Sequence, residues 1–306
     1  MKFGFSLIMR GNSATPEAFE KLAERAEALD LDSLWCSDHL IVPRDVESKY
    51  VGRADGKFPE SWRERYWEPF TVLGYLAACT KKIQLGTSVL ILPMRNPIEV
   101  AAMIADLDQL SGGRIVFGVG VGWFREEFEV LNWPFRERGA RTNEGLAICK
   151  TLWSDDSPRF DGRFYRFGES DFAPKPVQKP HPPIWIAGNS SAALRRVAKY
   201  GNGWHPFKPS LEALEQGKQE LAGYLEAEGR RMEDIVISAK GHLTFTDSAP
   251  DAGQWPLEGR VEDIVAGIER FGELGVEHFI LDYLPETLDK GLDTMERFAQ
   301  EIRPKL

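Results

Sequence analysis

The sequence predicts a TIM (β/α)8 barrel, an α/β fold. Eight short apolar runs alternate with segments of helical periodicity along 306 residues, a length and element count that suit this fold. Several runs, such as the stretch 115–119 of predicted strand 114–119, carry no polar side chain, as expected for parallel strands with both faces buried. A doubly wound open sheet is the alternative, but no G-x-G-x-x-G follows the first run. We therefore expect a single domain over residues 1–306.

The strands are predicted from short apolar runs that end at glycine or polar residues. In chain order they cover residues 3–8, 33–36, 83–90, 114–119, 183–188, 203–205, 234–245 and 276–283.

The helices are predicted from apolar positions that recur every three or four residues. In the first helix these are Phe19, Leu22, Ala23, Ala26 and Leu29, and Pro16 suits its first turn. The predicted helices cover residues 16–29, 69–79, 97–110, 126–153 with a break near Pro134, 192–200, 211–228, 261–274 and 288–302.

Two segments interrupt the alternation, one after strand 2 (37–68) and one between strands 4 and 5 (154–182). The second contains two aromatic runs around Asp161-Gly162 that predict a hairpin. Loops at the carboxyl ends of barrel strands build the active site, so we expect both insertions to shape the substrate pocket. For the first insertion an oligomer contact is an equal alternative. It carries the aromatic residues Tyr50, Phe58, Trp62, Tyr66 and Trp67.

Composition narrows the functional classes. The net charge of −9 disfavours nucleic acid and anionic membranes as partners, and no run of 18 apolar residues exists. We therefore expect a cytoplasmic protein. Cys36, Cys79 and Cys149 each lie in an apolar run and lack C-x-x-C spacing, so buried reduced thiols are expected. No histidine or cysteine spacing indicates a metal site.

Glycine-rich turns follow two neighbouring strands. Gly118, Gly120 and Gly122 leave strand 4, and Gly188-Asn189-Ser190 leaves strand 5 and opens a helix. Backbone N–H groups in such turns can bind an anion, so the pair could hold one phosphorylated cofactor. The alternative is that the glycines only permit tight turns.

Histidine and tryptophan side chains also follow the strands. His39 comes directly after Asp38 at the end of strand 2, and an imidazole there suits proton transfer, although a structural role is the alternative. For His205, packing or substrate contact is as plausible as catalysis. Tryptophans near strand ends could form the wall of a pocket for a flat ring, or simply pack in the core. They are Trp35, Trp123 and Trp204.

The sequence resembles the luciferase-like monooxygenase family, in particular its deazaflavin-dependent branch. The matching segments are SLWCSDHL, WEPFTVLGYLAACT, IQLGTSVLILPMRNPIEVA, LDQLSGGRIVFGVGVGW, RTNEGLAICKTLW and KPVQKPHPPIWIAG followed by GNGWHP. The resemblance implies a TIM barrel with flavin chemistry at its mouth, acting on a small organic substrate. Members with flavin mononucleotide (FMN) activate oxygen, whereas members with coenzyme F420 transfer a hydride. Coenzyme F420 is expected here, with reduced FMN as the alternative.

The resemblance also implies roles for individual residues. His39 would exchange a proton beside the ring and Asp38 would contact the cofactor. Ser88 and Val89 match a strand-3 bulge with a non-proline cis peptide, which would support one face of the ring. The remaining cofactor contacts would come from two turns that hold the ribityl-phosphate tail. These are Gly120, Val121 and Gly122 in one turn and Gly188, Asn189 and Ser190 in the other.

Partners and rival functions follow from the same reading. We expect a homodimer and a separate reductase that supplies reduced cofactor, because the chain shows no Rossmann unit for a nicotinamide. The first rival is a lyase or isomerase that uses the glycine turns for a substrate phosphate and His39 as its base. The second rival is a non-catalytic cofactor carrier on the same barrel.

Overall fold

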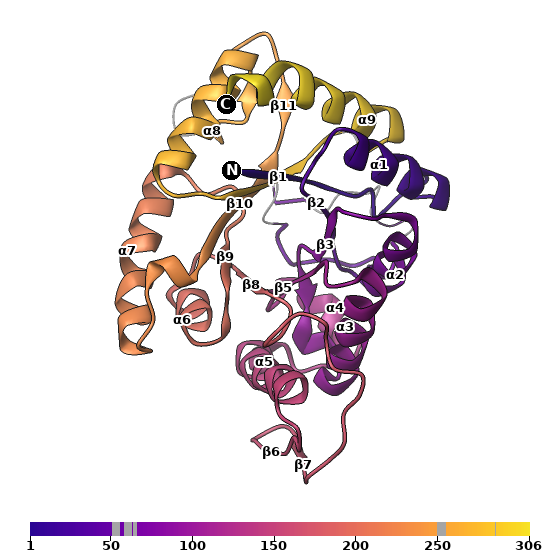
Figure 1. The fold of residues 1–306 in the computed structure, drawn as a ribbon, viewed down its shortest axis with the longest axis vertical. Coiled ribbons are helices and arrows are strands. Elements are labelled where there is room, and N and C mark those ends of the chain that lie inside the picture. The colour runs from indigo at the N-terminus through magenta and orange to yellow at the C-terminus, as the bar shows by residue number, and fades with distance from the viewer. Residues whose placement is uncertain (51–55, 58–62, 64–65, 250–254, 285) are drawn as a thin grey trace.

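The fold is a closed barrel of parallel strands surrounded by helices, as seen in a computed structural model (Figure 1). It describes residues 1–306 except 51–55, 58–62, 64–65, 250–254 and 285. The strands run β3-β2-β1-β13-β10-β9-β8-β5, and pairing of β3 with β5 closes the ring. The TIM barrel prediction is therefore confirmed. The barrel strands are β1 (Lys2–Ser6), β2 (Ser33–Cys36), β3 (Gln84–Thr87), β5 (Ile115–Gly120), β8 (Ile184–Ala187), β9 (Gly203–His205), β10 (Val236–His242) and β13 (His278–Asp282).

The helices form the outer layer of the barrel (Figure 1). Three begin with proline in the first turn, where its missing N–H costs nothing, and are capped by the side chains of Thr15, Glu68 and Asn96. The predicted break near Pro134 is confirmed, since one helix ends at Val130 and the next begins at Arg138. The helices are α1 (Pro16–Ala28), α2 (Pro69–Cys79), α3 (Pro97–Ser111), α4 (Arg125–Val130), α5 (Arg138–Ser154), α6 (Ser191–Tyr200), α7 (Leu211–Ala227), α8 (Val261–Glu273) and α9 (Leu288–Arg297).

Two tryptophans fill the inside of the barrel. Trp35 of β2 and Trp185 of β8 stack with their ring centroids 5.0 Å apart. Glycines on adjacent strands make room for them, because a Cβ at Gly86 would lie 2.4 Å from Trp35 and one at Gly203 2.4 Å from Trp185. The barrel is therefore a packed core below its mouth, as the fold requires.

Strand 3 is interrupted where the sequence predicted one continuous strand. β3 ends at Thr87, and the chain resumes pairing with β5 as β4 (Leu90–Ile91). The peptide bond between Ser88 and Val89 is cis, as predicted. The predicted strand 234–245 likewise divides after His242, and β11 (Thr244–Phe245) pairs with β12 (Glu258–Gly259) instead.

The second insertion folds as a hairpin on the outside of the helix layer. β6 (Phe160–Asp161) pairs antiparallel with β7 (Arg166–Phe167), which confirms the predicted hairpin (Figure 1). The backbone N–H groups of residues 163, 164 and 165 donate to the carboxylate of Glu144 on α5. The insertion precedes β8 rather than following a strand, which separates it from the barrel mouth.

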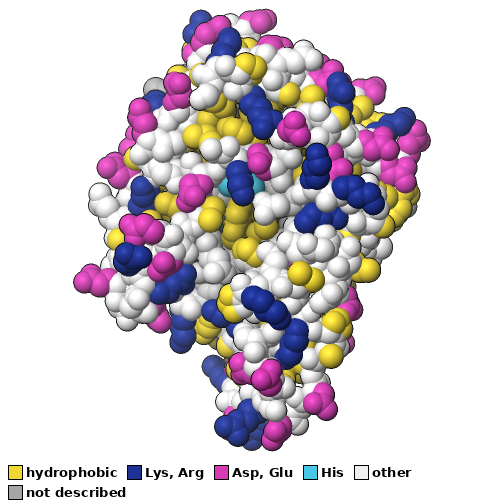
Figure 2. Space-filling model, viewed as in Figure 1, with side chains coloured by type: hydrophobic (Ala, Val, Ile, Leu, Met, Phe, Trp, Pro, Cys, Tyr) yellow, Lys and Arg dark blue, Asp and Glu magenta, His cyan; other side chains and the backbone are white. Residues whose placement is uncertain are grey.

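The surface carries charges of both signs. On the face shown in Figure 2, Asp and Glu side chains are interspersed with Lys and Arg side chains. Within the described residues, no helix has both the length and the hydrophobicity needed to cross a membrane. In the same residues no group of three or more His, Cys, Asp or Glu side chains could hold a metal ion. Cys36 and Cys149 are buried free thiols, but Cys79 is exposed, so the expectation of burial was wrong for it.

Candidate active site

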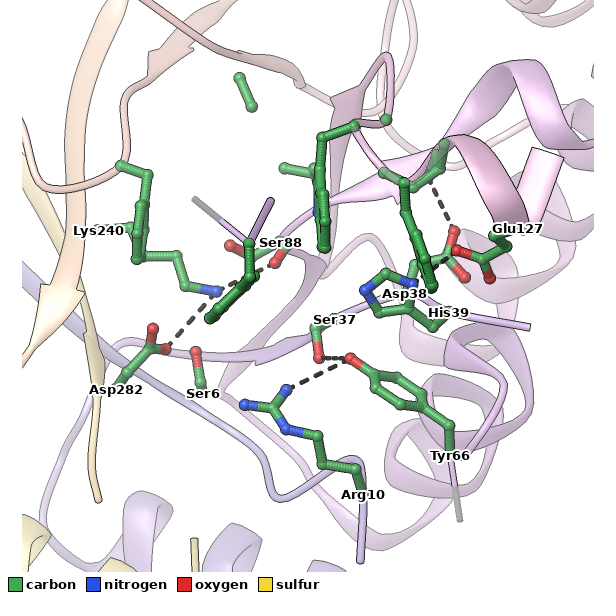
Figure 3. A pocket seen from close by; sticks show the side chains of 18 of the residues that line it. Ser6, Arg10, Ser37, Asp38, His39, Tyr66, Ser88, Glu127, Lys240 and Asp282 are labelled. Atoms are coloured by element: carbon green, nitrogen blue, oxygen red, sulfur yellow. Dashed lines mark hydrogen bonds and ion pairs between the residues drawn. The ribbon is translucent and has the colours of Figure 1, made fainter. Parts of the chain in front are cut away.

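A cavity opens at the carboxyl ends of the barrel strands (Figure 3). It encloses about 1010 Å³ of space free of protein atoms and is open to solvent. Residues on or just after all the barrel strands contribute to its wall, which is the arrangement expected for a TIM barrel active site. The lining includes Ser6, Arg10, Ser37, Asp38, His39, Tyr66, Ser88, Val89, Ile91, Met94, Gly122, Trp123, Phe124, Glu127, Phe128, Ala187, His205, Lys240, Asp282 and Glu286.

His39 forms a buried hydrogen bond with Glu127, the third residue of α4. His39 Nδ1 lies 2.7 Å from Glu127 Oε2. The other oxygen, Oε1, accepts from the backbone N–H of Leu40 at 2.6 Å and of Ile41 at 3.3 Å. These bonds hold the carboxylate as an acceptor, so Nδ1 of His39 donates to it and the tautomer is fixed. The second ring nitrogen, Nε2, points toward the cavity (Figure 3).

Asp38 is committed to protein contacts. Its Oδ2 accepts from Arg95 Nη1 at 2.6 Å and from the Ile91 backbone N–H at 2.8 Å, and its Oδ1 accepts from Arg95 Nη2 at 2.8 Å. The guanidinium thus binds the buried carboxylate with two parallel hydrogen bonds. Although Asp38 borders the cavity, these bonds favour a role in fixing β4 over the direct cofactor contact that the resemblance implied.

Ser88 is held by residues of three other strands, β2, β9 and β10. Its backbone N–H donates to Cys36 O at 2.7 Å, its hydroxyl lies 2.8 Å from His205 Nε2, and its carbonyl accepts from Lys240 Nζ at 3.0 Å. Burial, with smaller contributions from Lys240 and His278, lowers the pKa of His205 to about 3. His205 is therefore neutral near pH 7.

The hydrogen-bond chain around His205 defines its tautomer. Ser238 Oγ donates to Trp204 O at 3.1 Å, so it must accept from His205 Nδ1, which lies 2.7 Å away. Nε2 then has a free lone pair and accepts from the Ser88 hydroxyl. His205 thus orients Ser88 in the cavity wall and is not available as a proton donor there.

The rest of the wall divides into an apolar and a polar side. The apolar side comes from β4, α4 and the segments around them: Val89, Ile91, Met94, Phe124 and Phe128. Trp123 adds a ring stacked on Phe124 with centroids 5.2 Å apart, so the expectation that it walls a pocket is confirmed. Trp35 and Trp204 are instead core residues, 0% and 1% exposed.

The polar side comes from residues on or after β1, β2, β10 and β13, together with Tyr66 of the first insertion. Arg10 donates to Tyr66 Oη at 3.5 Å and pairs closely with Glu286, and Tyr66 Oη lies 2.5 Å from Ser37 Oγ. Burial is the main cause of the raised pKa of Glu286, and Arg10 opposes it. Lys240 Nζ lies 3.6 Å from Asp282 Oδ1.

The glycines of predicted strand 4 lie on and just after β5 and are packed closely against neighbouring segments, and their contact with a phosphate tail stays a prediction. A Cβ at Gly118 would lie 1.8 Å from Thr87 O, one at Gly120 2.5 Å from Val89 Cγ2, and one at Gly122 2.7 Å from Ile91 Cγ2. Side chains and backbone of strand 3 occupy that space. Gly122, with a φ of +79°, borders the cavity. Gly120 and Val121 are not among the described residues that line it.

The strand-5 turn lies at the edge of the site. Gly188, Asn189 and Ser190 follow Ala187, which lines the cavity, but are not themselves in the described lining. Gly188 has a φ of +113°, and the Ser190 hydroxyl accepts from the Ala193 N–H to cap α6. Asn189 and Ser190 are exposed, so the helix start is open to solvent beside the cavity.

Sequence reasoning missed several lining residues. Glu127 sits among neighbouring acidic residues in α4 and carries no distinguishing pattern. Lys240 could have been found, because it is a charged residue inside the apolar run of β10. The second insertion (154–182) contributes no described residue to the cavity lining, so the expectation that it shapes the pocket was wrong. From the first insertion, Tyr50 and Tyr66 line the cavity, while Phe58 and Trp62 lie outside the described residues.

Comparisons with known proteins agree with this architecture. Residues 1–270 match the family model for luciferase-like monooxygenases. An F420-dependent glucose-6-phosphate dehydrogenase of Amycolatopsis mediterranei is 31% identical, and the match covers 95% of each chain. An FMNH2-dependent dimethylsulfone monooxygenase of Pseudomonas putida is 31% identical over 60% of this chain and 51% of that one.

A solved structure shares the fold along the whole chain. The monooxygenase RslO1 from Streptomyces bottropensis superposes with a TM-score of 0.81 at 20% identity, and the match covers 99% of both chains. The family match and the relatives favour an oxidoreductase over the lyase or isomerase alternative. On these grounds the chain belongs to the luciferase-like monooxygenase family, an oxidoreductase family whose relatives here are F420-dependent dehydrogenases and FMNH2-dependent monooxygenases.

Proposed function

We propose that the protein is an F420-dependent oxidoreductase of a small organic substrate, with His39 as the residue that exchanges a proton with that substrate. The observation that carries the proposal is the His39–Glu127 pair at 2.7 Å in the wall of the mouth cavity. With Nδ1 donating to the carboxylate, Nε2 can accept a proton from a substrate hydroxyl or, once protonated, return it to a carbonyl oxygen. A phenol or lysine would lack this reversibility near neutral pH.

The cavity fits a flat, partly apolar ring. Such a ring needs apolar walls and a few hydrogen-bonding groups. Here Val89, Ile91 and Met94 supply apolar contacts, and the Ser88 hydroxyl is held in place by His205. When bound, coenzyme F420 would supply a hydride donor or acceptor at its ring. We propose that Ser88 and Val89 support one face of it, that Gly122 borders it, and that His39 faces the reacting atom.

We propose that the phosphate of the cofactor binds at the start of α6. The N–H groups in the first turn of a helix attract an anion, and Ser190 and Asn189 add polar groups, while the Ala193 N–H is already bonded to Ser190. Gly188 lets the backbone turn into that position, since its φ of +113° is one that other residues rarely adopt. We propose that Gly120, packed against Val89, and Val121 shape the turn beside the cavity without contacting the ring themselves.

F420 is preferred over FMN because of how far each relative matches. The F420-dependent dehydrogenase matches along 95% of this chain, whereas the FMNH2-dependent monooxygenase matches along 60%. Reduced FMN stays the alternative, and it would lead to oxygenation instead of hydride transfer.

The test is a titration of the protein with F420 and with FMN, each in its oxidised and its reduced form. Binding is monitored by fluorescence. Micromolar binding of F420 with no comparable binding of FMN is expected. The reverse preference would replace hydride transfer by oxygenation, and failure of both cofactors to bind would remove the proposal. The wild type and Ser190→Ala form a matched pair that tests the phosphate site. Ser190→Ala should bind F420 more weakly than the wild type does.

Two partners stay predictions. A homodimer would be detected by sedimentation velocity. A separate reductase would be needed if the protein, given F420 and a reduced nicotinamide, does not reduce the cofactor by itself.

A further inference from the structure

The polar side of the cavity is built to present hydrogen-bond donors without net charge. Arg10 pairs with Glu286, with side chains 14% and 23% exposed, and Lys240 lies near Asp282, with side chains 12% and 18% exposed. Each cation therefore has its own carboxylate. An anionic group placed here would have to compete with those carboxylates, whereas an uncharged polar group would not.

The hydrogens on this side have a defined direction. A guanidinium can only donate, so Arg10 donates to Tyr66 Oη. Tyr66 Oη and Ser37 Oγ are 2.5 Å apart, and the phenol is the more acidic of the two hydroxyls, so it donates to Ser37. Burial raises the pKa of Tyr66 well above its usual value, which keeps the phenol protonated and able to donate.

The Ser37 hydrogen then has no acceptor in the described part of the chain. The Tyr66 hydroxyl is the side-chain partner of Ser37, and Ser37 lines the cavity. Its hydrogen is therefore directed at whatever the cavity holds. The neighbouring Ser6 gives an independent observation, since its Oγ is buried and has no hydrogen-bond partner among the described residues. Buried polar atoms in native proteins are nearly always paired, so a ligand atom is the expected partner.

These donors lie beside the proposed proton-exchanging residue. The rings of His39 and Tyr66 meet edge to face with centroids 5.2 Å apart. Figure 3 shows Ser37, Tyr66 and Arg10 on the same side of the cavity as His39, below the Ser88 segment. A substrate oxygen that reaches Ser37 is thus also near His39.

We propose that Ser37 donates a hydrogen bond to an uncharged oxygen of the substrate, at or next to the carbon that reacts. Tyr66 and Arg10 are positioning residues that set the direction of the Ser37 hydrogen, and Ser6 supplies a second polar contact. The substrate class is accordingly a neutral ketone, aldehyde or alcohol, and not a carboxylate or phosphate. This inference rests on the proposed function, because it places that oxygen within reach of His39.

The experiment compares two probes of the same shape, cyclohexanone and methylenecyclohexane. Only the ketone can accept a hydrogen bond. Binding of each to the intact protein is measured by saturation-transfer NMR, with and without F420. The wild type should bind cyclohexanone up to about tenfold more tightly, the factor that one net hydrogen bond supplies. The preference should vanish in Ser37→Ala, fall in Tyr66→Phe, and persist in Ser37→Thr. Ser157→Ala, an exposed serine of the second insertion, is the matched control.

The outcomes separate this inference from the proposed function. If F420 fails to bind the wild type while cyclohexanone is still preferred in a Ser37-dependent way, the cofactor assignment is wrong and the donor assignment stands. If F420 binds but the wild type shows no preference for the ketone, or Ser37→Ala keeps it, the donor assignment is overturned. Tighter binding of cyclohexane carboxylate than of cyclohexanone would overturn the neutral substrate class.

Discussion

At the scale of single residues, the site depends on two buried carboxylates with different tasks. Glu127 orients His39, whereas Asp38 binds Arg95 and the β4 backbone. Both side chains are buried, yet only Glu127 contacts His39, the residue proposed to exchange protons. Their substitution should therefore give different results.

We expect Glu127→Gln to reduce turnover by about 100-fold, the usual scale for general acid–base catalysis. The amide cannot both accept from His39 and accept from the two backbone N–H groups, because its nitrogen has no lone pair to offer. The tautomer of His39, read by long-range 15N NMR, should shift from mainly Nδ1–H to a mixture. Glu129→Gln, an exposed change on the same helix, should leave both readouts unchanged. An unaltered His39 tautomer in Glu127→Gln would argue against the orienting role.

We expect Asp38→Asn to lower the free energy of unfolding by about 3 kcal/mol, since it leaves the Arg95 guanidinium buried beside a neutral amide. Urea denaturation measures the loss, and Asp45→Asn at an exposed position serves as the control. F420 affinity should change little at temperatures where the variant is folded. A large loss of affinity in a stable variant would restore the direct cofactor contact that the sequence suggested.

At the scale of elements, close packing against neighbouring segments requires glycine on and just after β5, the predicted strand 4. Gly118 is the tightest, because a Cβ there would lie 1.8 Å from Thr87 O, a backbone atom that cannot rotate away. Glycine spacing alone therefore does not identify a phosphate site, because G-V-G-V-G looks the same whether a phosphate or a neighbouring strand fills the space.

We expect Gly118→Ala to destabilise the protein by several kcal/mol or prevent folding, as overpacking against backbone does. Gly223→Ala on α7 is the matched control, because no atom lies within 4 Å of its Cβ position. There the substitution should stabilise by up to about 1 kcal/mol, since alanine favours a helix over glycine. Thermal unfolding of both variants decides the matter, and tolerance of Gly118→Ala would contradict the packing account.

The elements themselves were predictable because local patterns determine them. β2 and β9 occur where expected, and Pro69–Cys79 is the predicted helix. The departures have local causes. Strand 3 breaks at Ser88, where the chain turns to let β4 pair with β5, and no periodicity in the sequence marks that point.

At the scale of the whole molecule, barrel closure brings together residues that are far apart in sequence. Lys240 bonds to Ser88 across 152 positions, and Arg10 pairs with Glu286 across 276. His39 could be proposed because it follows predicted strand 2, and Ser88 could be proposed from the family resemblance. Their partners could not, because which side chain meets which depends on register and on side-chain direction around the closed ring.

Closure also buries two neutral histidines inside the barrel, which makes stability depend on pH. Burial lowers the pKa of His205 to about 3, with Lys240 and His278 acting in the same direction. Burial also lowers the pKa of His278 to about 3, with smaller effects from Lys2 and the N-terminal amine. In the unfolded chain each imidazole binds a proton below pH 6.5, whereas in the folded state each stays neutral down to about pH 3. The free energy of unfolding must therefore fall as the pH drops through this window.

We expect the wild type to lose about 2 kcal/mol per buried histidine between pH 7.5 and pH 5.0. Urea denaturation at the two pH values measures it, and His205→Gln removes one of the two contributions. The variant should be less stable at pH 7.5, because Ser88 and Ser238 lose their shared partner, but its further loss on acidification should be smaller than that of the wild type by about 2 kcal/mol. Other titrating groups are common to both proteins and cancel in the difference. Equal losses in the two proteins would mean that His205 is already protonated in the folded barrel, and the tautomer derived for the Ser88–His205–Ser238 chain would then be wrong.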